Sequence, residues 1–227
     1  MADMGHGYGS ECHLLRYLGR HRGLLDTRVS AVTGSQTIRW LDFGFDPRGT
    51  WPDAELKGMD FLPDHEPAKV AWGAFWPQRG NVPNWDAVAC ITVDGRDEWL
   101  LVEAKAHLGE MRSSCMAKPE GGRAQIVDAL DATKQALKVP PDRDWLNGYY
   151  QYCNRVVALH FLIARNISAR LLFLYFTGDQ SNSPQRICPK KEAGWSQALR
   201  AQDNHVGFPA GHLLADRIHT MFLPVCV

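Results

Sequence analysis

The chain has 227 residues, which is long enough for one substantial domain with a real hydrophobic core. Hydrophobic residues make up 45% of the chain and charged residues 22%, and this composition excludes a protein dominated by disorder. Lysine plus arginine equals aspartate plus glutamate at 25 each, so any site for a polyanion has to be a local patch.

Cysteine usage and the amino-terminal sequence bear on the cellular compartment. The six cysteines form no CxxC pair and no repeated spacing, which argues against a disulfide framework and leaves structural zinc as a minor alternative. The chain does not open with a basic region followed by an apolar stretch, and no run of about eighteen apolar residues occurs in it. We therefore expect a reduced, cytoplasmic protein with no membrane partner.

The first expected elements are a helix over residues 11–22 and a strand over residues 36–45. Glu11 lies three and four residues before Leu14 and Leu15, so its carboxylate is expected to share their face and point toward the interior. Loose alternation of apolar and polar residues predicts the strand.

Residues 46–84 are rich in proline, glycine and tryptophan and show no sustained period. Loops of this length are uncommon in a compact domain and are usually functional or disordered, and the aromatic content argues against complete disorder. We expect a long irregular insertion or lid within a single domain that spans residues 1–227.

The next segment carries the clearest pattern. The apolar run 87–93, the turn Asp94-Gly95 and the apolar run 98–106 predict a β-hairpin. Beyond the hairpin, the apolar spacing predicts helices over 123–137 and 145–165, a buried strand over 169–176 and a short helical stretch over 195–199.

Three charged residues are expected to converge at one end of this hairpin. Asp86 sits across from Glu103 if the turn has two residues and across from Lys105 if it has four, and residues two apart on a strand share a face. Two carboxylates in a partly buried site repel each other unless a cation neutralises them. Oxygen ligands suit Mg²⁺, and a neighbouring lysine can position or deprotonate a water and stabilise charge on a phosphate.

The spacing of these residues resembles a known signature. Asp86, followed after the hairpin by Glu103-Ala104-Lys105, is similar to the D…(D/E)xK pattern of the PD-(D/E)XK nuclease superfamily, although Trp85 stands where that pattern has a proline. The expected order of elements also resembles the αβββαβ core of the superfamily. The resemblance implies an α/β domain of restriction endonuclease-like architecture, with a mixed central sheet flanked by helices.

The resemblance further implies the role of each residue in the signature. Asp86 and Glu103 would bind Mg²⁺ or Mn²⁺, and the main-chain carbonyl of Ala104 would add a ligand. Lys105 would serve the attacking water.

Two positions outside the signature resemble site residues of some members. Glu11 corresponds to a further glutamate on the first helix, and Gln151 to a polar residue near the metal, with Arg155 one turn later. Ordinary structural roles stay open for all three: an exposed acid in a first helical turn, and side chains that satisfy buried backbone or pair with acids.

The function that we expect is metal-dependent hydrolysis of phosphodiester bonds in nucleic acid, with DNA preferred over RNA, and a homodimer stays open as an assembly. One alternative is a catalytically inactive module of the same fold that binds nucleic acid or protein. Another is a metal-dependent hydrolase of small phosphorylated molecules, over which the insertion would close. A purely structural reading also stays open. In that reading, Glu103 and Lys105 form the solvated end of a strand at the edge of the sheet, and Asp86 caps the strand that pairs with it.

Overall fold

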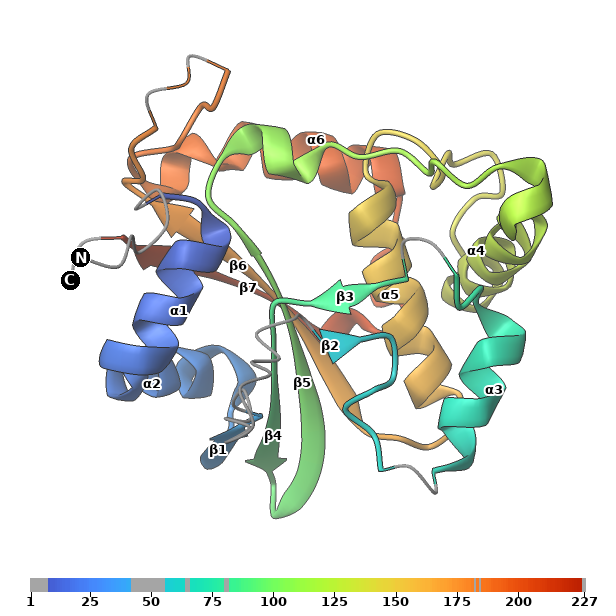
Figure 1. Cartoon of the computed structure of the whole chain (residues 1–227), viewed down its shortest axis with the longest axis horizontal. Helices are drawn as coiled ribbons and strands as arrows, with labels where there is room; N and C mark the ends of the chain where they lie inside the picture. Colours follow the sequence, from blue (N-terminus) through green and yellow to red (C-terminus); the bar gives the residue numbers. More distant parts are fainter. Residues whose placement is uncertain are drawn as a thin grey trace, which may run out of the picture.

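A computed structural model describes residues 8–41, 56–63, 66–79, 82–181, 183 and 185–225. Its centre is a mixed five-stranded sheet in the order β1-β4-β5-β6-β7 (Figure 1). The strands are β1 (Thr37–Trp40), β4 (Ala87–Val93), β5 (Arg96–Lys105), β6 (Ala169–Thr177) and β7 (Ile218–Pro224). Strand β4 runs antiparallel to both of its neighbours, β1 and β5, whereas β6 runs parallel to β5 and β7 parallel to β6. The expected α/β class with a mixed sheet flanked by helices is confirmed.

The hairpin forms with the shorter of the two turns. Val93 pairs with Arg96, which leaves Asp94 and Gly95 as a two-residue turn. Their φ angles are 51° and 73°, the left-handed values that a type I′ turn needs at both positions. The register that the sequence left open is therefore the one in which Asp86 lies across from Glu103.

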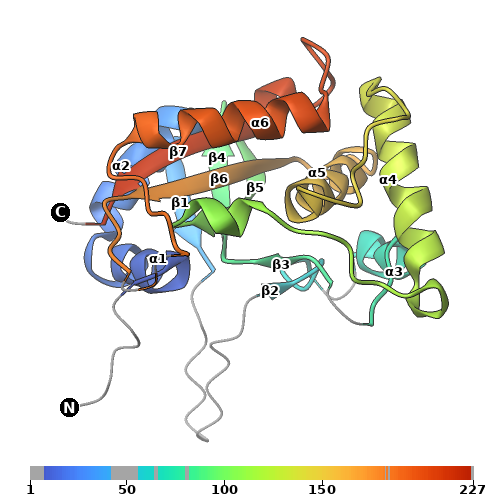
Figure 2. The same cartoon turned by 90° about the horizontal axis from the view of Figure 1, so that it is seen from above.

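Helices cover both faces of the sheet (Figure 2). Along one face lie α1 (Ser10–Arg20) and α2 (Arg22–Thr33), and on the side of the other face lie α3 (Pro67–Phe75), α4 (Arg123–Leu137), α5 (Tyr150–Ile163) and α6 (Ser196–Val206). Short 3₁₀ turns complete the described elements: η1 (Leu108–Met111), η2 (Pro119–Gly121), η3 (Glu192–Gly194) and η4 (Ala215–Arg217).

Strand β5 is buried on both faces because its successive side chains enter two different cores. Leu101 packs with the helices α3 to α6, whereas Leu100, Val102 and Ala104 pack with α1 and α2. Glu103 and Lys105 follow Leu101 at steps of two and therefore point toward α5. The purely structural reading, a solvated edge strand, is wrong because β6 covers the other side of β5.

The expected insertion over residues 46–84 is corrected in its described part. Strand β2 (Leu56–Lys57) pairs with β3 (Asn84–Trp85), and α3 lies between them. Trp72 and Trp76 are buried, with their rings stacked 5.8 Å apart. These residues form core rather than an irregular lid, and α3 escaped prediction because a nine-residue apolar helix shows too little periodicity. Residues 46–55, 64, 65, 80 and 81 lie outside the described residues.

Other elements differ from the expectation in their bounds or were not predicted. The first expected helix ends at Arg20 and a second helix, α2, follows it at once. Helix α5 begins at Tyr150 rather than near residue 145, because the carboxylate of Asp144 accepts the N–H groups of Leu146 and Asn147 and holds them in a turn. Strand β7 was not predicted. Among the described helices, none combines the length and apolar character needed to cross a membrane.

Candidate functional site

Glu103 lies at the centre of a buried polar cluster that joins β5 to α5. Its side chain is 2% exposed. The ammonium of Lys105 contacts Oε1 of Glu103 directly and donates to Oε1 of Gln151 at 2.9 Å. Gln151 stands in the first turn of α5, where its backbone N–H donates to the hydroxyl of Ser113 at 2.7 Å. The cluster therefore depends on a helix and a strand whose contacting residues are 46 positions apart.

Arg155 occupies the other oxygen of Glu103. Its Nε donates to Oε2 at 2.7 Å, and its Nη1 donates to Oδ1 of Asn154 at 2.8 Å. The guanidinium also lies 5.2 Å from the centre of the Trp85 ring. Arg155 stands one helical turn beyond Gln151, so both residues reach Glu103 and Lys105 from the same face of α5.

The two cations determine the charge state of Glu103. Burial alone would raise the pKa of this carboxyl, but the Arg155 guanidinium and the Lys105 ammonium outweigh it and hold the pKa below its ordinary value. Glu103 is therefore ionised at neutral pH, and side chains of the protein supply its counter-charge.

Asp86 stands where the chain passes from β3 into β4. Its backbone N–H donates to the carbonyl of Val102 at 3.0 Å, and its Oδ2 accepts the N–H of Ala104 at 2.6 Å. The carboxylate thus meets the main chain of β5 next to Glu103. The structure brings Asp86, Glu103, Ala104 and Lys105 together at one end of the hairpin, with Gln151 added from α5.

Glu11 does not belong to this cluster, and the expected interior position of its side chain is wrong. It is exposed on α1, which covers the opposite face of the sheet. The buried side of α1 carries His13, Leu14 and Tyr17, while Leu15 is 44% exposed. The error arose because Leu15 was assigned to the apolar stripe, which turned the predicted face toward Glu11.

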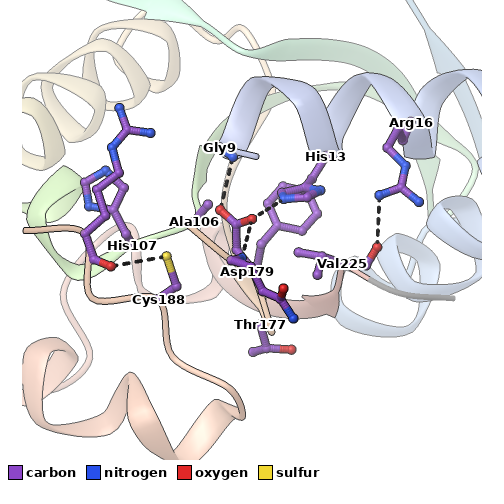
Figure 3. A network of polar contacts seen from close by, with 12 residues as sticks. Gly9, His13, Arg16, Ala106, His107, Thr177, Asp179, Cys188 and Val225 are labelled. Carbon is purple, nitrogen blue, oxygen red and sulfur yellow. Dashed lines mark hydrogen bonds and ion pairs between the residues drawn. The ribbon is translucent and has the colours of Figure 1, made fainter. Parts of the chain in front are cut away.

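A second buried polar pair fixes α1 to the loop after β6 (Figure 3). Nε2 of His13 lies 2.8 Å from Oδ1 of Asp179, and both side chains are 3% exposed. The backbone N–H groups of Gly9 and Gln180 also donate to this carboxylate, at 3.0 and 2.8 Å. Asp179 thus receives three donors and stabilises the start of α1.

The oxygen donors near β5 match a hard divalent cation by type. Mg²⁺ takes carboxylate and carbonyl oxygens, such as those of Asp86, Glu103 and Ala104. Within the described residues, no group of three or more His, Cys, Asp or Glu side chains is placed to hold a metal ion. Both oxygens of Glu103 already contact a cation, so a metal ion would have to share these oxygens with Lys105 and Arg155 or displace one of the two side chains.

Two spaces of very different volume border the cluster. Glu103 and Lys105 border a space of about 10 Å³, room for about one water molecule. A cavity of about 630 Å³ lies beside the cluster and is lined by Gln151 and Arg155. A ligand of substantial size would therefore reach Lys105 and Glu103 through these two residues of α5.

Comparison with known proteins returned no match: no protein-family model matches the sequence, and no curated protein or solved structure matches it either. The chemistry of the site therefore has to be inferred from its own residues. Sequence patterns assigned Arg155 only an incidental place, although it is one of the two cations that pair with Glu103. The sequence did contain a signal for this pairing, because Arg155 lies within an otherwise apolar helix and a buried arginine needs an acidic partner.

Proposed function

We propose that the chain hydrolyses phosphodiester bonds in nucleic acid, with DNA preferred over RNA, at the cluster around Glu103 and Lys105. The observation that carries this proposal is the meeting of Asp86, Glu103 and Lys105 at one end of β5. The order of elements adds support. Within the longer series of elements, α1, β1, β4, β5, α5 and β6 follow the order αβββαβ with β6 parallel to β5, while α2, β2, α3, β3 and α4 are additional.

Metal ligation in this proposal falls to three residues. Asp86, Glu103 and the carbonyl of Ala104 would hold Mg²⁺ or Mn²⁺, which when bound polarises the scissile phosphate. Oδ2 of Asp86 accepts the N–H of Ala104, which holds this carboxylate beside β5. In this role Glu103 would share its oxygens with Lys105 and Arg155 or release one of them.

The geometry favours one of the two roles open to Lys105. Its Nζ donates to Glu103 and Gln151, and an ammonium has three donors and no acceptor. In this role Lys105 orients the attacking water and stabilises negative charge on the phosphate. In the step itself the water oxygen bonds to phosphorus and the bond to the leaving sugar oxygen breaks. The proton lost by the water passes to solvent, and the leaving oxygen takes up a proton from solvent.

A second candidate is a module of the same fold that binds a partner without catalysis. The observation in its favour is the charge balance at Glu103, whose two oxygens are already neutralised by Lys105 and Arg155. Such an arrangement stabilises the buried carboxylate with no metal ion.

One set of measurements separates these candidates. The proposal expects Mg²⁺-dependent nicking of supercoiled plasmid or cleavage of single-stranded DNA, abolished in Lys105→Ala and retained in Lys191→Ala, which changes an exposed lysine. Titration with Mn²⁺ should show binding that Asp86→Asn removes. Metal binding without nucleic-acid cleavage would point to small phosphorylated substrates. Absence of both metal binding and cleavage would reject hydrolysis and favour the binding module.

A further inference from the structure

The cavity of about 630 Å³ beside the cluster has walls from three parts of the chain. Its lining comes from β2, β3 and the segment after α3, from the segment between η1 and α4 together with the start of α4, and from the first turns of α5. Figure 1 shows where these elements lie in the fold. The lining residues are Lys57, Pro77, Arg79, Val82, Asn84, Ser113, Ser114, Cys115, Met116, Ala117, Gly121, Ile126, Tyr150, Gln151, Asn154 and Arg155.

The charge of this lining has one sign. Lys57, Arg79 and Arg155 contribute cations, of which Arg155 is paired with Glu103 behind the lining, and no Asp or Glu occurs among the described residues that line the cavity. Lys57 and Arg79 are exposed, and neither forms an ion pair with any residue that the structure describes. In a chain with no net charge, such a local surplus of positive charge favours an anionic ligand.

The rest of the lining combines polar and apolar side chains, a combination that suits nucleotides. Asn84 and Ser114 offer hydrogen bonds to phosphates or base edges, while Val82, Met116 and the ring of Tyr150 offer apolar surface. Single strands are recognised by cationic side chains along the backbone together with aromatic and apolar surface against the base faces. A duplex shields its base faces by stacking, so it cannot use the apolar part of this lining.

We propose that this cavity binds a single polynucleotide strand, with its phosphates toward Lys57 and Arg79 and the scissile phosphate near Gln151 and Arg155. The inference rests on the proposed function, because that function makes the anion a nucleic acid. A volume of about 630 Å³ lies in the range for a ligand of drug size, which corresponds to a nucleotide or two rather than a base-paired duplex.

The test uses charge reversal at exposed residues that take no part in the cluster. Lys57→Glu combined with Arg79→Glu, the cavity variant, is compared with Arg28→Glu combined with Arg96→Glu, which makes the same change of charge on α2 and at the start of β5. A fluorescent dodecamer of thymidylate and a duplex of equal length are the probes, and EDTA prevents metal-dependent cleavage. Circular dichroism and thermal melting verify that each variant folds.

The expected result is binding of the single strand that weakens roughly tenfold in the cavity variant and little in the control. The slope of binding against salt should also fall by about 0.7 for each phosphate that the cavity variant no longer neutralises. Equal weakening in both variants, or tighter binding of the duplex than of the single strand, would overturn the proposal. So would no binding of the single strand by the unaltered protein.

Cleavage separates this inference from the proposed function. If cleavage of DNA depends on Lys105 but is unchanged in the cavity variant, the proposed hydrolysis is supported and the cavity is rejected as the site that binds the substrate. If the protein cleaves no nucleic acid but binds the single strand, and the cavity variant loses this binding, the cavity is supported as a binding site and the proposed hydrolysis is rejected.

Met116 offers a readout that needs no substitution. It is 82% exposed, whereas the other described methionines, Met59, Met111 and Met221, are 2%, 4% and 3% exposed. A bound strand covers Met116, so the single-stranded dodecamer should slow its oxidation by peroxide as followed by peptide mass spectrometry. Unchanged oxidation at saturating single strand would contradict the proposal.

Discussion

Arg155 donates its Nε–H to Oε2 of Glu103 at 2.7 Å, with side chains that are 6% and 2% exposed. The two residues are 52 positions apart and join the centre of the sheet to the helix that covers it. Because the pair is almost fully desolvated, removal of either partner leaves a buried charge without adequate compensation. Stability and the candidate chemistry therefore depend on the same carboxylate.

Replacing Arg155 by methionine should lower the free energy of unfolding by about 3–5 kcal/mol, the usual cost of breaking a buried ion pair from one side. Denaturation with urea measures the change. Arg200→Met removes an exposed arginine of α6 and should shift the free energy by less than about 0.5 kcal/mol. Similar small changes in both variants would show that Lys105 alone compensates Glu103.

The lowered pKa of Glu103 predicts a loss of stability in acid. In the folded state the pKa lies below its ordinary value of 4.5, so between the two values the unfolded chain holds a proton that the folded chain does not. Stability from this group is complete above pH 4.5 and is lost as the pH falls through the folded pKa. Urea denaturation from pH 7 to pH 3 should show a steeper loss in the native sequence than in Glu103→Gln. Parallel curves would contradict the prediction.

Two substitutions of Asp86 should separate structure from metal binding. Asp86→Asn keeps an oxygen that can accept the N–H of Ala104, whereas Asp86→Ala removes it and should cost about 1–3 kcal/mol. Both substitutions remove the anionic ligand, so both should abolish Mn²⁺ binding and Mg²⁺-dependent cleavage. Calorimetry and urea denaturation measure the two effects. Metal binding that persists in a folded Asp86→Asn protein would exclude Asp86 as a ligand.

The hairpin turn should be sensitive to a side chain at Gly95. Its φ angle is 73°, so Gly95→Ala should destabilise the protein by roughly 1 kcal/mol. Gly23 provides the opposite case, because it lies inside α2 and an added Cβ would meet nothing within 4 Å. Gly23→Ala should therefore stabilise by about 0.4–1 kcal/mol, and thermal melting should shift in opposite directions. A shift of the same sign in both would refute the turn assignment.

Local patterns in the sequence were sufficient for the hairpin and for the strand and helix that follow it. The two apolar runs on either side of Asp94-Gly95 predicted β4 and β5, and the apolar run from Ala169 predicted β6. Steps of two along β5 also placed Glu103 and Lys105 on one face without knowledge of any partner. These features depend on neighbours within a few residues, which the sequence displays directly.

Only the tertiary structure decided which residues surround that face. Arg155 and Gln151 meet Glu103 and Lys105 through contacts between segments about 50 positions apart, and Glu11 is exposed because α1 packs through His13 instead. The pairing of β7 with β6 and the burial of Trp72 have the same origin. Each of these features is decided by burial against segments that are distant in the sequence. The free energy of that burial depends on the packed fold and produces no periodic pattern in the local sequence.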